Sequence, residues 1–169
     1  NKPVIWTLHD CWSFTGHCTY FDFVSCNKWK NNECGSCPQK MKYPSSLFFD
    51  SSSKNYEKKK HLFNSIDNLT IVTPSKWLAL LVGQSFLKDH DIEVINNGIE
   101  LNIFKKTNSN VRDKYGLTGK RIILAVADGW GPRKGLNDII RLSKILPEDN
   151  KIIMVGLNGN EQEKIPENI

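Results

Sequence analysis

Hydrophobic and polar positions along the first half of the chain predict alternating strands and helices. Short apolar or β-branched runs predict a buried strand over residues 3–8 and further strands over 69–73 and 92–96. Residues 47–65 and 74–88 carry apolar side chains at helical spacing, so both segments are predicted to be helices. The order strand, helix, strand is typical of α/β proteins with parallel sheets.

The second half repeats this order after a polar segment. Residues 105–120 are polar and are predicted to form a linker, interrupted by a short helix around 110–115. Residues 121–127 are apolar at successive positions, as in a strand of a parallel sheet buried on both faces. A predicted helix over 135–146 and a predicted strand over 151–156 follow. We therefore expect two parallel-sheet halves.

Composition is that of a globular protein with an unusual first third. Of 169 residues, 39% are hydrophobic and 24% charged, which argues against disorder. The longest uninterrupted apolar run has six residues, whereas a membrane-spanning helix needs about 20. Residues 1–63 hold 12 of the 17 aromatic side chains, and residues 9–44 have no helical period and are predicted to be a loop. Because Asn1 leads almost at once into a strand and no signal peptide opens the chain, we expect a piece of a longer protein.

The net charge of +5 comes mainly from a lysine cluster in the first predicted helix, Lys54, Lys58, Lys59 and Lys60. One interpretation is a patch for phosphate, nucleic acid or an anionic membrane surface. We favour the other, the solvated face of a helix, because polar residues interrupt the run and no nucleic-acid motif accompanies it.

The loop after residues 121–127 is the first candidate binding site. Open α/β sheets bind ligands at the carboxyl ends of their strands, and here Arg133 and Lys134 lie at that end and at a helix start. Two cations oppose the helix dipole there unless an anion is bound, so the pair favours a phosphate site. The alternative is a turn with two solvated cations.

His9 and Asp10 directly follow the first predicted strand and form the second candidate. A histidine at the carboxyl end of a strand faces the same cleft region, and Asp10 could orient its ring. From the residues alone we favour the alternative, a loop histidine followed by an aspartate that caps a turn.

Four cysteines form the third candidate, with seven, seven and two residues between Cys18, Cys26, Cys34 and Cys37. Four thiolates can hold a tetrahedral Zn²⁺, although these spacings are not a standard zinc pattern. Reduced thiols are the main alternative, since no secretory signal suggests an oxidising compartment, and disulfides or redox chemistry remain open. His17 could replace one ligand, and Cys11 is expected to be a core residue.

Several stretches, in order, together resemble one family. They are residues 7–18, 34–39, 73–78, 95–100 with Phe104, and 132–136. This ordered set resembles the bacterial glycosyltransferases of family 4, retaining enzymes of GT-B fold, and within them the subgroup that builds capsular, exopolysaccharide and lipopolysaccharide sugars. The family's fold has two Rossmann-like domains that face a cleft.

The resemblance implies roles for several of these residues. His9 matches the cleft histidine that helps position the reacting groups, and is the expected catalytic residue. Lys134 matches the lysine that binds the donor pyrophosphate, with Arg133 as its neighbour. Asp10 and Trp12 are candidates for the acceptor side. Catalysis in the family needs no metal, so zinc bound by the cysteines would be structural.

The resemblance also divides the chain. Residues 1–104 match the carboxyl-terminal part of the acceptor-binding domain, with a cysteine-rich loop at 11–38. Residues 105–120 match the linker and crossover, and residues 121–169 the amino-terminal part of the nucleotide-sugar-binding domain. The expected fold is thus α/β and GT-B-like, with both Rossmann-like halves incomplete.

Some family features are missing. Asp128 and Gly129 stand where many members carry a second arginine on the pyrophosphate, and Glu161, Glu163 and Glu167 do not match the family's pair of donor-binding glutamates. We therefore expect weak or no transferase activity from the 169-residue chain alone.

The implied activity is transfer of a hexose from a UDP- or GDP-sugar to a glycan or lipid-linked acceptor, with retention, in cell-surface polysaccharide synthesis. The expected location is the cytoplasm, at the inner face of the cytoplasmic membrane, with no nucleic-acid partner. The alternative function is a zinc-stabilised module whose basic, aromatic first third contacts nucleic acid or an anionic membrane surface.

Overall fold

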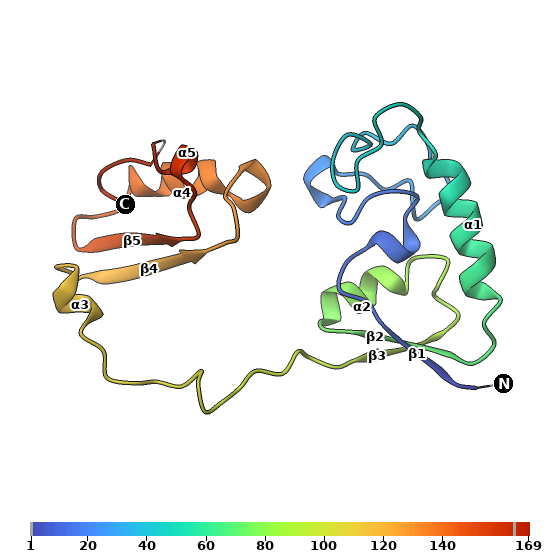
Figure 1. Cartoon of the computed structure of the whole chain (residues 1–169), viewed down its shortest axis with the longest axis horizontal. Coiled ribbons are helices and arrows are strands. Elements are labelled where there is room, and N and C mark those ends of the chain that lie inside the picture. Colours follow the sequence, from blue (N-terminus) through green and yellow to red (C-terminus); the bar gives the residue numbers. More distant parts are fainter. Residues whose placement is uncertain (1, 164) are drawn as a thin grey trace. The chain divides into compact units, whose positions relative to one another are not determined.

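The computed structural model describes residues 2–163 and 165–169 and confirms a mixed α/β fold with parallel strands in two small sheets. The chain divides into two compact units, of which the first ends at Glu100 and the second runs from Leu101 to Ile169 (Figure 1). No helix in these described residues is long and apolar enough to cross a membrane. Two small parallel sheets are consistent with two incomplete Rossmann-like halves.

The sheet of the first unit has the order β1-β2-β3, with all strands parallel. Its strands are β1 (Val4–Thr7), β2 (Leu69–Thr73) and β3 (Asp91–Val94). The central strand β2 is largely buried, whereas β1 is not: Ile5 is 73% exposed, which makes the prediction of a buried first strand wrong. The cause is position, because β1 pairs with a neighbour on one side only in the described residues.

Two helices pack in this unit, α1 (Ser52–Asn64) and α2 (Lys76–Val82), and both are shorter than predicted. Residues 47–51 are not helical, and the side chains of Leu47 and Phe48 are exposed. The α2 helix contacts β2 and β3, and the Ser75 hydroxyl caps it by accepting a hydrogen bond from the Leu78 amide at 3.3 Å.

The long connection between β1 and α1 contains only two short 3-10 turns, η1 (Trp12–Phe14) and η2 (Asp22–Val24). It is ordered by a buried aromatic cluster, in which the rings of Phe14, Phe21 and Trp29 pack at centroid distances of 4.7–6.4 Å. The Tyr56 hydroxyl of α1 donates to the Trp29 carbonyl at 2.8 Å. Aromatic burial thus replaces regular structure in this segment.

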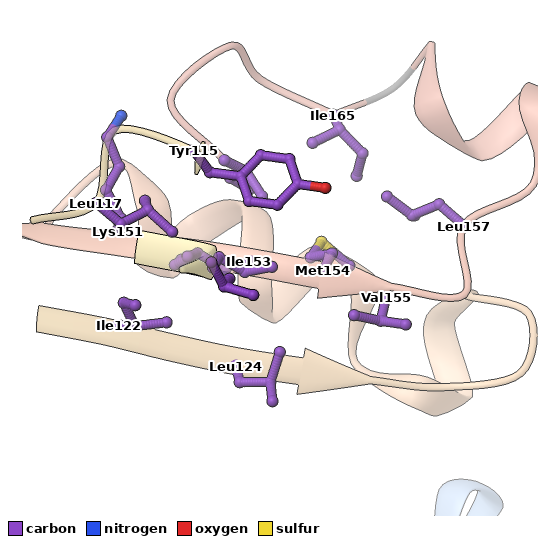
Figure 2. A pocket seen from close by; sticks show the side chains of 13 residues that line it. Tyr115, Leu117, Ile122, Leu124, Lys151, Ile153, Met154, Val155, Leu157 and Ile165 are labelled. Carbon is purple, nitrogen blue, oxygen red and sulfur yellow. The ribbon is translucent and has the colours of Figure 1, made fainter. Parts of the chain in front are cut away.

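The second unit follows the predicted order. Its elements are α3 (Val111–Lys114), β4 (Arg121–Val126), η3 (Pro132–Lys134), α4 (Leu136–Ser143), β5 (Asn150–Val155) and α5 (Gly159–Gln162). The strands β4 and β5 are parallel neighbours. Apolar side chains of both strands, with Tyr115 and Ile165, line an open hollow of about 780 Å³ (Figure 2). The expected burial of β4 on both faces is therefore incomplete: Leu124 is 62% exposed.

Candidate functional site

His9 lies at the carboxyl end of β1, where the chain leaves the sheet of the first unit. The preceding residue, Leu8, is buried and its amide still donates to the Val72 carbonyl of β2 at 2.8 Å. The His9 side chain is exposed, while its carbonyl accepts a hydrogen bond from the Tyr20 hydroxyl at 3.2 Å. The backbone of His9 is thus fixed on both sides and its ring faces solvent.

Asp10 caps the turn that follows. Its carboxylate oxygen Oδ1 accepts a hydrogen bond from the Trp12 amide at 2.8 Å, which is the turn-capping geometry given above as the alternative. Among the described residues, no hydrogen bond joins this carboxylate to the ring of His9. Asp10 therefore shapes the loop after β1 and does not orient the imidazole.

Trp12 and Phe14 lie two residues apart and have opposite environments. Phe14 is fully buried in the aromatic cluster, whereas Trp12 is 41% exposed. The Lys59 ammonium of α1 lies 3.4 Å from the centroid of the Trp12 ring, a cation–π contact. Of the two aromatic side chains, Trp12 is the one that a ligand can reach.

Lys59 contradicts the interpretation of its cluster as a solvated face. It is buried, and its Nζ donates to the carbonyl oxygens of Trp12 at 2.7 Å and Thr15 at 3.0 Å. Burial lowers the pKa of Lys59 to about 8. The sequence held a signal that was missed: Ser52, Tyr56 and Lys59 are spaced four and three residues apart, and together they are the buried side of α1.

The five cysteines are free thiols, and Cys11 is buried in the core as predicted. Cys18 and Cys37 are neighbours, with 3.5 Å between their sulfurs. Burial, followed by the hydrogen bond with Cys37, raises the pKa of Cys18 to about 12. Cys34 is held separately, since its sulfur accepts a hydrogen bond from the Gly16 amide at 3.4 Å.

These positions test how well the thiols fit a zinc ion. Among the described residues, no group of three or more histidine, cysteine, aspartate or glutamate side chains is arranged to hold a metal. The neighbouring sulfurs of Cys18 and Cys37 supply two ligands, and Cys26 and Cys34 do not complete the set as placed. The imidazole Nε2 of His17 is buried without a partner in the described residues. Structural zinc stays a prediction.

Arg133 and Lys134 lie in the second unit, in the 3-10 turn η3 between β4 and α4. Gly135 joins this turn to the helix with a φ of +77°, a left-handed conformation that suits glycine. Both basic side chains are exposed, and in the described part of the chain the Lys134 ammonium has neither a carboxylate nor a hydrogen-bond partner. An unpaired cation therefore lies at the carboxyl end of a parallel strand and just before a helix.

Glu161 supports this loop, a role that the sequence did not predict. Its Oε1 accepts a hydrogen bond from the Trp130 amide at 2.8 Å, while its Oε2 accepts one from the Asn158 amide at 2.9 Å in a capping box of α5. The Trp130 indole also donates to the Val155 carbonyl at 3.0 Å. The missed signal was the Asn-x-x-Glu spacing of a capping box.

The structure thus places the site residues in two groups. His9, Asp10 and Trp12 share the loop after β1 in the first unit, with Lys59 beneath them. Arg133 and Lys134 share the loop after β4 in the second unit, supported by Glu161. In each unit the group lies at the carboxyl end of a parallel strand, where α/β proteins bind ligands.

Comparison with known proteins gives one informative similarity. The chain is 33% identical over 106 residues to the "Putative colanic acid biosynthesis glycosyl transferase WcaC" of Escherichia coli (strain K12). The aligned region covers 60% of this chain and 25% of that protein, so the chain spans about a quarter of its relative's length. No family model and no solved structure matches. The similarity supports the expected relationship to glycosyltransferases.

Proposed function

We propose that this chain is part of a glycosyltransferase that moves a sugar from a nucleotide sugar to a glycan or lipid-linked acceptor in cell-surface polysaccharide synthesis, with retention. The relative's name supports the reaction class and the type of pathway. The observation that carries the proposal is the Lys134 ammonium, exposed and unpartnered in the described residues at the carboxyl end of β4.

The charge distribution at this loop suits a diphosphate. The amino-terminal end of α4 carries a partial positive charge, and Lys134 and Arg133 add two full charges directly before it. The lysine supplies a point charge and the arginine a planar fork of donors, the two modes of phosphate recognition in proteins. Transfer of the sugar leaves a nucleoside diphosphate, and these cations would stabilise the charge that develops on it.

On the acceptor side, His9 is proposed to position the reacting groups beside the transferred sugar. Its backbone is fixed by the β1–β2 pairing and by the Tyr20 hydroxyl, so its ring starts from a defined place. The ring is exposed and makes no hydrogen bond with Asp10, so both of its nitrogens are available to a substrate. A fixed backbone with an accessible ring is what substrate positioning requires.

Titration with UDP and GDP tests the donor site. We expect either nucleotide to raise the thermal stability of the chain, and Lys134→Ala to weaken its binding by at least about tenfold, or roughly 1.4 kcal/mol. The matched control is Lys144→Ala, which removes an exposed lysine just after α4. Failure of both nucleotides to bind, or equal losses in the two variants, would contradict the proposal.

The cysteine-rich loop is proposed to bind structural zinc, and metal analysis tests this separately from the transferase proposal. The expected result is one zinc ion per chain, lost in the variant Cys34→Ser. A metal-free chain with all five thiols titratable would contradict it.

A further inference from the structure

Trp12 is an exposed side chain whose position is nevertheless fixed. Its amide donates to the Asp10 carboxylate at 2.8 Å, and its carbonyl accepts from the Lys59 ammonium at 2.7 Å. The same ammonium lies 3.4 Å from the centroid of the indole ring. Because these contacts already order the indole, a ligand that packs on it loses little further conformational entropy.

A small hollow separates the Trp12 indole from α1. It has a volume of about 290 Å³ and is lined by Trp12, Asn55, Lys58, Lys59, Leu62 and Phe63. Its size lies at the lower end of the range for small-molecule pockets, about 300 to 1,000 Å³, so it fits one ring and not a whole nucleotide.

The lining of this hollow is apolar on its walls and polar at its edge. Trp12, Leu62 and Phe63 supply the walls, and Leu62 is 48% exposed although its neighbours on the helix could have covered it. Asn55 and Lys58 are exposed residues of α1 and supply an amide and an ammonium. The Lys59 ammonium is already held by two carbonyls, which leaves Lys58 as the cation free to meet a ligand.

We propose that this hollow binds one pyranose ring of the acceptor; this inference rests on the proposed transferase function and identifies where the acceptor sugar lies. A pyranose has an apolar face of C–H groups and a rim of hydroxyl groups. The face matches the indole and leucine walls, and the hydroxyl rim matches the donors of Asn55 and Lys58. Trp12 follows His9 by three residues on the same loop, so a ring bound here lies at the same end of β1 as the expected catalytic histidine.

The test is titration of the chain with methyl glucopyranoside, methyl galactopyranoside and methyl glucuronide, followed by the indole N–H signals in NMR spectra. We expect a saturable shift of the Trp12 signal with at least one glycoside. Trp12→Ala is expected to weaken binding at least about tenfold, as for an aromatic anchor. Trp77→Ala is the matched control, because Trp77 is 47% exposed on α2 and does not line the hollow.

A second variant guards against loss of the fold in Trp12→Ala. Asn55→Ala removes only an exposed amide at the rim, and it is expected to weaken glycoside binding while the spectrum of the remaining chain stays unchanged. The proposal is overturned if no glycoside shifts the Trp12 signal, if Trp77→Ala loses as much affinity, or if phenol binds as tightly as the sugars.

Nucleotide titration of the same samples separates this inference from the proposed function. Trp12→Ala is expected to leave UDP and GDP binding unchanged, because those ligands are assigned to the loop of Lys134. Nucleotide binding without any glycoside binding overturns the acceptor subsite alone. Glycoside binding at Trp12 without nucleotide binding supports the sugar site and contradicts the transferase function.

Discussion

Lys59 brings a positive charge into the first unit, where two carbonyl oxygens and an indole face replace water. Burying an ammonium is costly unless hydrogen bonds compensate it, and here the carbonyls of Trp12 and Thr15 are within 3.0 Å of Nζ. These carbonyls belong to the end of η1, where the partial negative charge of a helical turn favours a cation. Lys59 therefore holds the loop that carries His9 and Trp12.

Lys59→Met is expected to lower the free energy of unfolding by about 1–3 kcal/mol at pH 7, because two carbonyls lose their donor. Burial lowers the pKa of Lys59 from 10.5 to about 8, so between these values the unfolded chain binds more protons and wild-type stability rises with pH. The stability difference between wild type and variant should therefore grow from about pH 8 to pH 10. Urea unfolding in a reducing buffer measures both effects.

The thiols do not disturb this comparison. Burial raises the pKa of Cys11 and Cys18 to about 12, which lowers stability at high pH, but it does so in wild type and variant alike and cancels in the difference. Lys54→Met, an exposed lysine on the same helix, is the control and should change little at any pH. A difference between wild type and Lys59→Met that shrinks above pH 8 would contradict the assignment.

Gly16 lies where the loop after β1 meets the start of α1. A Cβ atom at this position would lie 2.2 Å from the Ser52 carbonyl oxygen, a backbone atom that cannot move cheaply. Gly16→Ala is expected to destabilise the first unit by about 2 kcal/mol or more in chemical denaturation. In Gly35→Ala the nearest atom would be 3.6 Å away, so this control should stay within about 0.5 kcal/mol of wild type.

Single residues show how far sequence patterns can predict a site. The pattern placed His9, Arg133 and Lys134 at strand ends, and the structure has them there, because strand and helix periodicity fix where loops begin. Lys58 and Lys59 are chemically identical neighbours, yet one is exposed and the other buried. Only the rotational phase of α1 against Tyr56 separates them, and the charge cluster hid that phase.

At the scale of elements, the type of each strand and helix was predictable but its ends were not. The parallel pairing of β4 with β5 follows from two apolar runs separated by a helix. The start of α1 was missed because Leu47, Phe48 and Phe49 continue an apolar spacing, although all three are exposed and non-helical. The long β1–α1 connection has no periodicity, so its aromatic packing could be known only from the fold.

Glu161→Ala tests whether α5 supports the loop of Lys134. The change removes the acceptor of the Trp130 amide together with half of the capping box, so we expect a loss of about 1–3 kcal/mol in the second unit. Hydrogen exchange at the Trp130 amide should become faster. Glu163→Ala removes an exposed carboxylate at the end of the same helix and is expected to leave that exchange unchanged. Equal effects of the two variants would show that charge alone is responsible.

At the scale of the whole molecule, the chain consists of two compact units joined by an exposed polar segment, and limited proteolysis tests this division. Lys105 and Lys106 are exposed and lie outside helices and strands, whereas Lys58 is exposed within α1. Because proteases need an extended, accessible backbone, brief trypsin treatment should cut first at Lys105 or Lys106. Mass spectrometry should then find a larger amino-terminal and a smaller carboxyl-terminal product, both resistant to further cleavage. First cleavage at Lys58 would contradict the division, since it would require α1 to open before the connecting segment is cut.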